Sequence, residues 1–161
     1  MESNHPDCST SVNSAERPSQ TAGQLERDLA QAVQTLYQQL LGQKPTRVVC
    51  HLFEKQLAVT LEGSPTKLEK FLADNEQVQL ATQVRASVDF IVKQRLISLI
   101  EVHLSVSVVE LLTNTSLESG HTGMIAVLSK TPVVRNPNIV PKTPGYQKLR
   151  RQSRLLDLAD C

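Results

Sequence analysis

The chain has 161 residues, of which 40% are hydrophobic but only 3% aromatic, with no Trp, so its core must be built from Val, Leu, Ile and Ala. Its net charge of +1 is uneven: residues 1–20 sum to −2, residues 21–130 to −1 and residues 131–161 to +4. A nucleic-acid-binding domain normally carries a basic stripe on its folded surface. The neutral central part therefore makes nucleic acid an unlikely partner.

The cysteines and the lengths of the apolar segments indicate in which cellular compartment the protein is located. Cys8, Cys50 and Cys161 are far apart and form no CxxC pair, which argues against a disulfide framework and a zinc knuckle. The polar N-terminus lacks the apolar run of a signal peptide, and no stretch reaches the roughly 18 apolar residues of a membrane span. We therefore expect a soluble, cytoplasmic protein.

The chain begins with a segment rich in Ser, Asn and Pro. Residues 1–20 contain one large aliphatic residue, Val12, and cannot bury enough surface to offset their ordering entropy. We expect them to form a disordered N-terminal tail. From Thr21 to Gly42, apolar residues recur at helical spacing, which predicts an amphipathic helix.

A hairpin and a capped helix follow. Two β-rich runs, Thr46 to Phe53 and Gln56 to Glu62, are separated by only two residues, which predicts a tight hairpin. The run from Gly63 to Pro65 then ends the second strand. The next helix begins with either Ser64 as its cap or Thr66 in a capping box with the glutamate three residues later.

A longer periodic segment after Asp74 and Asn75 predicts the central helix of the core. We expect its apolar seam to be formed by Val84, Val88, Ile91 and Leu96.

Charged residues lie along the same helix. Arg85, Asp89 and Lys93 are spaced for i,i+4 ion pairs, and we interpret them as a solvated face. Arg95 lies among apolar positions, so it is either solvated as well or reaches a carboxylate across an interface.

Two more β-rich runs, Val106 to Thr113 and Thr122 to Leu128, are joined by the polar loop Asn114 to His121. Hairpins that alternate with helices imply an antiparallel sheet, because parallel neighbours would need a crossover. We predict an α+β domain over residues 21–132: a four-stranded antiparallel sheet from two hairpins, with helices packed on one face. The run VSVVELL is apolar on both sides, so a homodimer is expected to cover the open face.

Residues 133–161 are predicted to be a Pro-rich, basic C-terminal tail. Its prolines exclude regular structure before Gly145, and five basic residues without an acid lie between Lys142 and Arg154. This tail is either solvated and disordered or docks on a protein partner or on anionic lipid, as a membrane-peripheral contact. The contact residues in the second case are Lys148, Arg150, Arg151 and Arg154.

The segments GQKPTRVVCHLFEKQLAVTLEGSPTKLEKFLADNEQ and VRASVDFIVKQRLISLIEVHLSVSVVELLTNTSLESGHTGMIAVLS resemble the MpsC-like family of small bacterial domains, formerly a domain of unknown function. The ending TSLESGHTGMIAVLSKTPVVRNP is similar to cyanobacterial members. The resemblance covers about residues 22–137 and rests on the whole domain rather than on a catalytic signature. It implies an accessory role beside a membrane-potential-generating system linked to cation or inorganic-carbon transport, and it carries over no catalytic residue.

The sequence contains none of the common catalytic or nucleotide-binding motifs. There is no GxSxG elbow, GxGxxG turn or P-loop, so we expect no enzyme activity and no cofactor. Cys50 and His51 are neighbours in a strand and point to opposite faces, which argues against a metal site. The loop from Ser119 to Gly123 is either a plain hairpin connection or a contact through Ser119, His121 and Thr122.

The sequence thus predicts a non-enzymatic, dimeric interaction or regulatory module. Two alternatives stay open: a sensor that binds a small ligand or ion between helix and sheet, and an uncharacterised enzyme.

Overall fold

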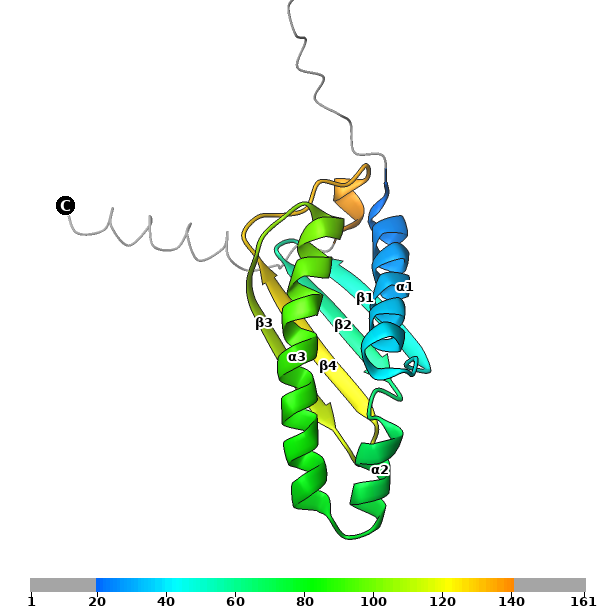
Figure 1. Cartoon of the computed structure of the whole chain (residues 1–161). Coiled ribbons are helices and arrows are strands. Elements are labelled where there is room, and N and C mark those ends of the chain that lie inside the picture. The colour runs from blue at the N-terminus through cyan, green and yellow to red at the C-terminus, as the bar shows by residue number, and fades with distance from the viewer. Residues whose placement is uncertain (1–19, 141–161) are drawn as a thin grey trace, which may run out of the picture.

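The order of helix, hairpin, helices and hairpin is confirmed by the computed structural model, which describes residues 20–140 (Figure 1). The expected tail at residues 1–19 and the basic residues from Lys142 onward lie outside this range. The elements are α1 (Ala22–Leu41), β1 (Arg47–Phe53), β2 (Gln56–Glu62), α2 (Lys67–Asp74), α3 (Val78–Leu104), β3 (Val108–Ser116), β4 (His121–Leu128) and the short 3-10 helix η1 (Pro137–Ile139).

The four strands form one antiparallel sheet in the order β1-β2-β4-β3. Each hairpin supplies one edge strand and one inner strand, so the two hairpins join where β2 pairs with β4. The helices lie on one face of this sheet (Figure 1). The predicted α+β class and its four antiparallel strands are therefore confirmed, and the opposite face is not covered by any described element.

Capping boxes start the first two helices. The Thr21 side chain accepts the N–H of Gln24, and the Gln24 side chain accepts the N–H of Thr21. Thr66 and Glu69 make the same exchange at α2, so Thr66 rather than Ser64 is the cap. Each box satisfies two N–H groups that an isolated helix end leaves without partners.

The core lies between the helices and the sheet, and α3 presents six residues to it. They are Ala81, Arg85, Val92, Leu96, Ile100 and Leu104.

The seam predicted for α3 was right for Leu96 and wrong for Ile91, which is 58% exposed. Val84 and Val88 are only partly buried. The physical reason is that α3 carries two apolar stripes, offset by one residue and hence by about 100° around the helix. Hydrophobic periodicity alone does not decide which stripe faces the sheet.

The chain continues to pack beyond Pro132. Val134 and Val140 are buried in the core, and the Asn136 side chain accepts the N–H of Ala22 at 2.8 Å. The N–H of Arg135 donates to the carbonyl of Gln20 at 2.9 Å. Residues 133–140, expected to belong to a tail, thus cover the start of α1, because prolines exclude regular hydrogen bonding but not apolar packing.

A matched pair of α3 substitutions tests which stripe is buried. Ile100 is 1% exposed and Val102 is 76% exposed. Ile100→Ala should lower the free energy of unfolding by about 2–5 kcal/mol because it leaves a cavity, whereas Val102→Ala should change it by less than about 0.5 kcal/mol. Chemical denaturation measures both, and equal losses would mean that the rotation of α3 is wrong.

Candidate functional site

A buried ionic cluster joins α2 to α3. Arg85 Nη1 lies 3.4 Å from Glu69 Oε1, and the side chains are 5% and 0% exposed. Arg85 Nε also donates to Asp89 Oδ1 at 2.9 Å. The second Glu69 oxygen accepts the N–H of Thr66 at 2.6 Å, so one carboxylate holds both the cap of α2 and the guanidinium. The predicted i,i+4 spacing of Arg85 and Asp89 is confirmed, but the solvated face is not, because Arg85 is buried.

Tyr37 of α1 lies near the same cluster and is fully buried. Burial raises the pKa of Tyr37 to about 12, although the nearby charge of Arg85 opposes this. Burial also opposes the charge on Arg85, but the hydrogen bond and charge of Asp89, together with Glu69, outweigh it and raise the pKa of Arg85. At neutral pH the cluster therefore contains a neutral phenol and a permanent cation.

This cluster is suited to holding helices together rather than to binding a metal. The Arg85 guanidinium stands between two carboxylates, where a metal ion would otherwise bring its positive charge. Within residues 20–140, no three His, Cys, Asp or Glu side chains gather closely enough to ligate a metal ion.

A chain of hydroxyl groups lies on the helix-facing side of the sheet. Thr122 Oγ1 is 2.6 Å from Ser64 Oγ and 2.7 Å from Thr115 Oγ1. Thr122 is buried, whereas Ser119 and His121 are exposed. Of the three loop residues named from the sequence, only Ser119 and His121 therefore reach the surface. Thr122 instead ties the second hairpin to the start of α2.

The turn beside these hydroxyls needs glycine. The N–H groups of Gly63 and Ser64 both donate to the carbonyl of Gly120, at 2.9 and 3.3 Å. Gly63 has a φ of +69°, and a Cβ at this position would lie 2.5 Å from Thr46 Oγ1. A side chain here would be strained at this positive φ and would clash with Thr46 at the start of the first hairpin.

Cys50 is an unreactive thiol. It is buried, and burial raises the pKa of Cys50 to about 12, with the charge of Glu26 adding to the shift. Because the thiolate is the nucleophile and the metal ligand, this group stays inert at neutral pH. His51 is exposed, in agreement with the predicted opposite orientation of the two side chains.

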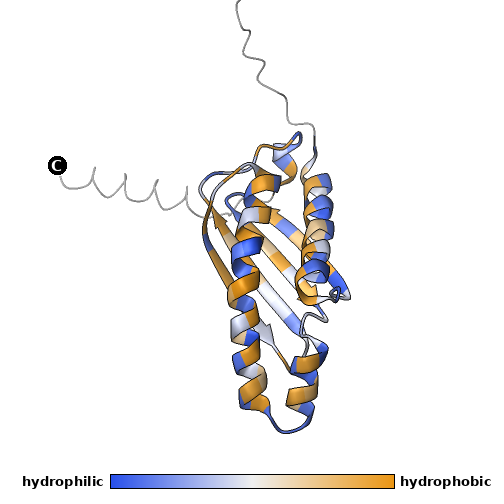
Figure 2. Cartoon of the chain, in the orientation of Figure 1, coloured by the Kyte–Doolittle hydropathy of each residue, from blue (hydrophilic) through white to orange (hydrophobic). Residues whose placement is uncertain are grey.

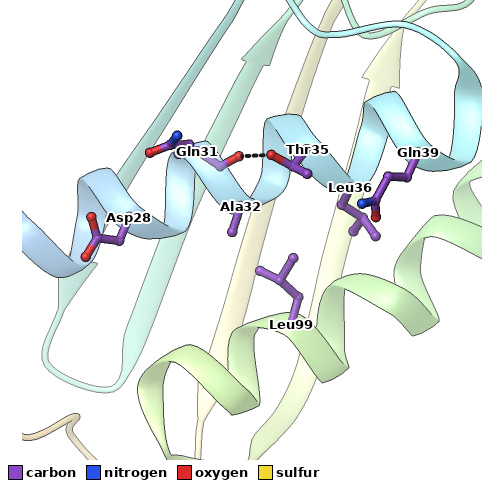
Figure 3. Close-up of a pocket in the computed structure, with 7 residues that line it drawn as sticks. All are labelled: Asp28, Gln31, Ala32, Thr35, Leu36, Gln39 and Leu99. Atoms are coloured by element: carbon purple, nitrogen blue, oxygen red, sulfur yellow. Dashed lines mark hydrogen bonds between the residues drawn. The ribbon is translucent and has the colours of Figure 1, made fainter.

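A groove of about 450 Å³ runs between α1 and α3. Ala32 and Leu36 of α1 point toward Leu99 of α3 across it (Figure 3). Its rim is polar, and the Thr35 hydroxyl there donates to the carbonyl of Gln31 at 3.0 Å. The groove thus offers an apolar floor with hydrogen-bonding side chains at its rim.

A second depression, of about 420 Å³, lies on the uncovered sheet face and is almost wholly apolar. Leu112 and Ile125 stand beside it and are 50% and 44% exposed. At Gly123 no atom would meet an added side chain, so this part of the sheet is hollow. Its lining residues are Ala58, Val59, Thr60, Leu112, Thr113, Asn114, Gly123, Met124 and Ile125.

The space between α3 and the sheet is much tighter. Near Asp89, Leu111 and Thr113 it does not admit a water-sized molecule. A ligand at this level would have to displace core side chains, so the open surface features are the better candidates for recognition.

Residues 20–140 form a two-layer α+β domain, and none of them covers the second face of the sheet. A family model described as "Na+-translocating membrane potential-generating system (MpsC)" matches residues 21–130. Because this match spans more than half of the sequence, the chain belongs to the MpsC family. No curated protein and no solved structure matches it. Among the helices of residues 20–140, none is both long enough and apolar enough to cross a membrane.

Removing one member of the buried cluster should be costly. Arg85→Leu leaves the Glu69 carboxylate buried without its cation, and the free energy of unfolding should fall by about 3–5 kcal/mol. Arg47→Leu is the control, because the Arg47–Glu62 pair spans 3.7 Å between exposed side chains and should contribute less than about 1 kcal/mol. Similar losses in urea denaturation would contradict the structural role of the cluster.

Proposed function

We propose that this MpsC-family chain is a non-enzymatic accessory protein of a membrane cation-translocating system and that it acts as a homodimer formed through the open sheet face. The observation that carries the proposal is the apolar hollow on a sheet face that no described element covers. The family description supplies the link to a membrane system.

The open sheet face has the size and chemistry of a contact with a second copy. Neighbouring strands lie about 4.8 Å apart and rise about 3.3 Å per residue, so four strands of this length span roughly 19 by 23 Å. This is a suitable face for an aligned packing of two sheets. The centre of the face is uncharged, and the Arg47–Glu62 pair lies away from it, across β1 and β2. Interface cores are likewise depleted in charge.

The second contact in this proposal is made by the basic C-terminal tail, which lies beyond the described residues. Lys148, Arg150, Arg151 and Arg154 give it a local excess of positive charge. Basic residues near an anionic membrane surface contribute about 1 kcal/mol each. The tail would therefore place the domain beside a membrane without crossing it.

A small-ligand sensor is the second candidate function. The groove between α1 and α3 favours it, because an apolar floor with a few hydrogen-bonding groups at the rim is the usual composition of a ligand site.

If two copies associate through the sheet face, a single charged substitution on this face should halve the measured mass of the protein. Ile125→Glu places a charge on the apolar face and should halve the mass measured by light scattering at micromolar concentration, because a desolvated carboxylate opposes association. Thr60→Ser, on the same face, is the conservative control and should leave the mass unchanged. A wild-type chain that stays at 17.8 kDa at every concentration would exclude the proposed dimer.

The tail contact predicts binding to anionic vesicles. The full chain should sediment with phosphatidylserine-containing vesicles but not with phosphatidylcholine vesicles, and added salt should release it. A chain ending at Val140 keeps the packed residues 133–140 and should lose this binding while its unfolding midpoint stays nearly unchanged. If the shortened chain still sediments, the membrane contact lies on the folded domain.

A further inference from the structure

The helical hairpin formed by α2 and the first half of α3 has charged residues on its inner side and apolar residues exposed to solvent, the reverse of the usual arrangement. Its inner side holds the ionic cluster of Glu69, Arg85 and Asp89. Large apolar side chains lie exposed on the same two helices, and Figure 2 shows hydrophobic residues along both of them. The exposed ones are Leu68, Phe71, Val78, Leu80, Phe90 and Ile91. A hairpin that is stable alone in water would bury the apolar side and expose the ions.

The outward side of α3 carries a straight apolar row. Leu80, Val84, Val88, Ile91 and Arg95 follow one another at intervals of four, four, three and four residues. This spacing averages close to the helical repeat, so the row stays on one side of an untwisted helix. Arg95, at its end, has no ion-pair partner among residues 20–140.

The neighbours of this row are small or uncharged. Gln83, Ala86, Ser87 and Gln94 are the exposed residues between and beside the apolar ones. Depletion of charge around exposed apolar residues is typical of the core of a protein interface.

The exposed apolar area is large enough for a specific contact. Leaving out Val78, which has the helical spacing of the buried residues Ala81 and Arg85, the other five large side chains present on the order of 100 Å² each, or roughly 500 Å² together. This is at the upper end of the apolar patches found on monomers and not far below the roughly 800 Å² that each partner contributes to a standard interface.

We infer that the outward face of the α2–α3 hairpin packs against the same face of a second copy, so that two hairpins form a four-helix arrangement about a twofold axis. In this arrangement the two α3 helices run antiparallel, as in a bundle. Opposing residues then have a constant sum of residue numbers. Placing Ile91 opposite Leu80 of the second copy also places Arg95 opposite Glu76 of the second copy.

The charges fit this register. Glu76 is exposed in the turn just before α3, and it lies about 28 Å along the helix from Arg95 of the same chain. The two side chains therefore cannot pair within one copy. Across the twofold axis they pair twice, once at each end of the contact, and so give Arg95 the carboxylate that residues 20–140 of its own chain do not supply.

This contact differs from the sheet contact and does not depend on it. The sheet face and the hairpin face lie on opposite sides of the domain, since the helices cover the other sheet face (Figure 1). Two different twofold contacts on one chain join four copies when their axes are perpendicular. The wild-type mass is then four times the chain mass.

Light scattering of the full chain with one substitution on each surface separates the two contacts. Ile91→Glu should halve the wild-type mass, Ile125→Glu should also halve it, and the double variant should give the chain mass of 17.8 kDa. Thr82→Glu is the matched control and should keep the full mass, because Thr82 is an exposed α3 position on the opposite side of the helix from Ile91. Because Ile91 is exposed in the monomer, adding Ile91→Glu should not unfold the domain. The double variant should therefore unfold within a few degrees of the Ile125→Glu variant.

A charge swap tests the register. Arg95→Glu and Glu76→Arg should each raise the dissociation constant of the hairpin contact about tenfold, because each variant opposes like charges at two places. The two substitutions combined should restore it to within about threefold. These measurements use the Ile125→Glu background, in which the hairpin contact alone holds two copies together.

Three results decide between the proposals. A mass unchanged by Ile91→Glu, or a double swap without rescue, overturns the hairpin contact. A mass halved by Ile91→Glu but unchanged by Ile125→Glu keeps the hairpin contact and removes the sheet dimer. A monomer that binds vesicles through Ile91 would show that the apolar row meets lipid, which also overturns the hairpin contact.

Discussion

The burial of one arginine, Arg85, determines how α2 and α3 pack in this structure. A guanidinium cannot leave water without anionic partners, and Arg85 finds them in Glu69 and Asp89. This requirement fixes the rotation of α3, because turning Arg85 toward the core also turns Val92 and Leu96 toward the sheet. The row one residue earlier must then face outward. The exposed position of Ile91 is thus the direct consequence of a buried charge.

The same arginine positions the beginning of α2. Glu69 can hold Arg85 only where the capping box places it, one turn into a helix whose cap is Thr66. The hydroxyl chain through Ser64 and Thr122 attaches this helix to the second hairpin. Local capping, a long-range ion pair and a loop contact therefore converge on one region. This region is polar where most domains of this size have an apolar core.

The elements of the fold could be predicted from local sequence because their signals are local. Thr21 and Gly42 delimit α1 through a capping box and a left-handed C-cap, and alternating apolar residues mark β2. The strand order could not be predicted, since a β2–β4 pairing leaves no trace in either strand alone. Nor could the packing of Val134 and Val140, because nearby prolines indicate the absence of regular structure and say nothing about burial.

Only one of the two candidate surfaces, the sheet face, could be predicted from the sequence. The sequence correctly predicts helices on one face of the sheet, and the neighbouring apolar residues Leu111 and Leu112 of β3 show that the other face is apolar as well. The hairpin surface cannot be predicted in this way, because the periodicity alone places Ile91 and Val88 in the core. The signal that could have found it is Arg85: a charged residue at the same spacing as the buried residues Ala81, Val92 and Leu96 leaves two assignments, and only its partner Glu69, sixteen residues away, decides between them.

The proposed self-association would also give a physical reason for the proposed weak membrane contact to be sufficient. A single tail with a few basic residues binds an anionic surface with only a few kcal/mol, and salt reduces this further. When two or four copies share one assembly, the second and later tails bind at a high effective concentration, and the combined affinity rises by orders of magnitude without new contacts. An assembly of this kind would stay at a membrane only as long as its contacts hold. The interfaces of the domain would then determine whether the protein stays at the membrane, and the tail would supply only the electrostatic attraction.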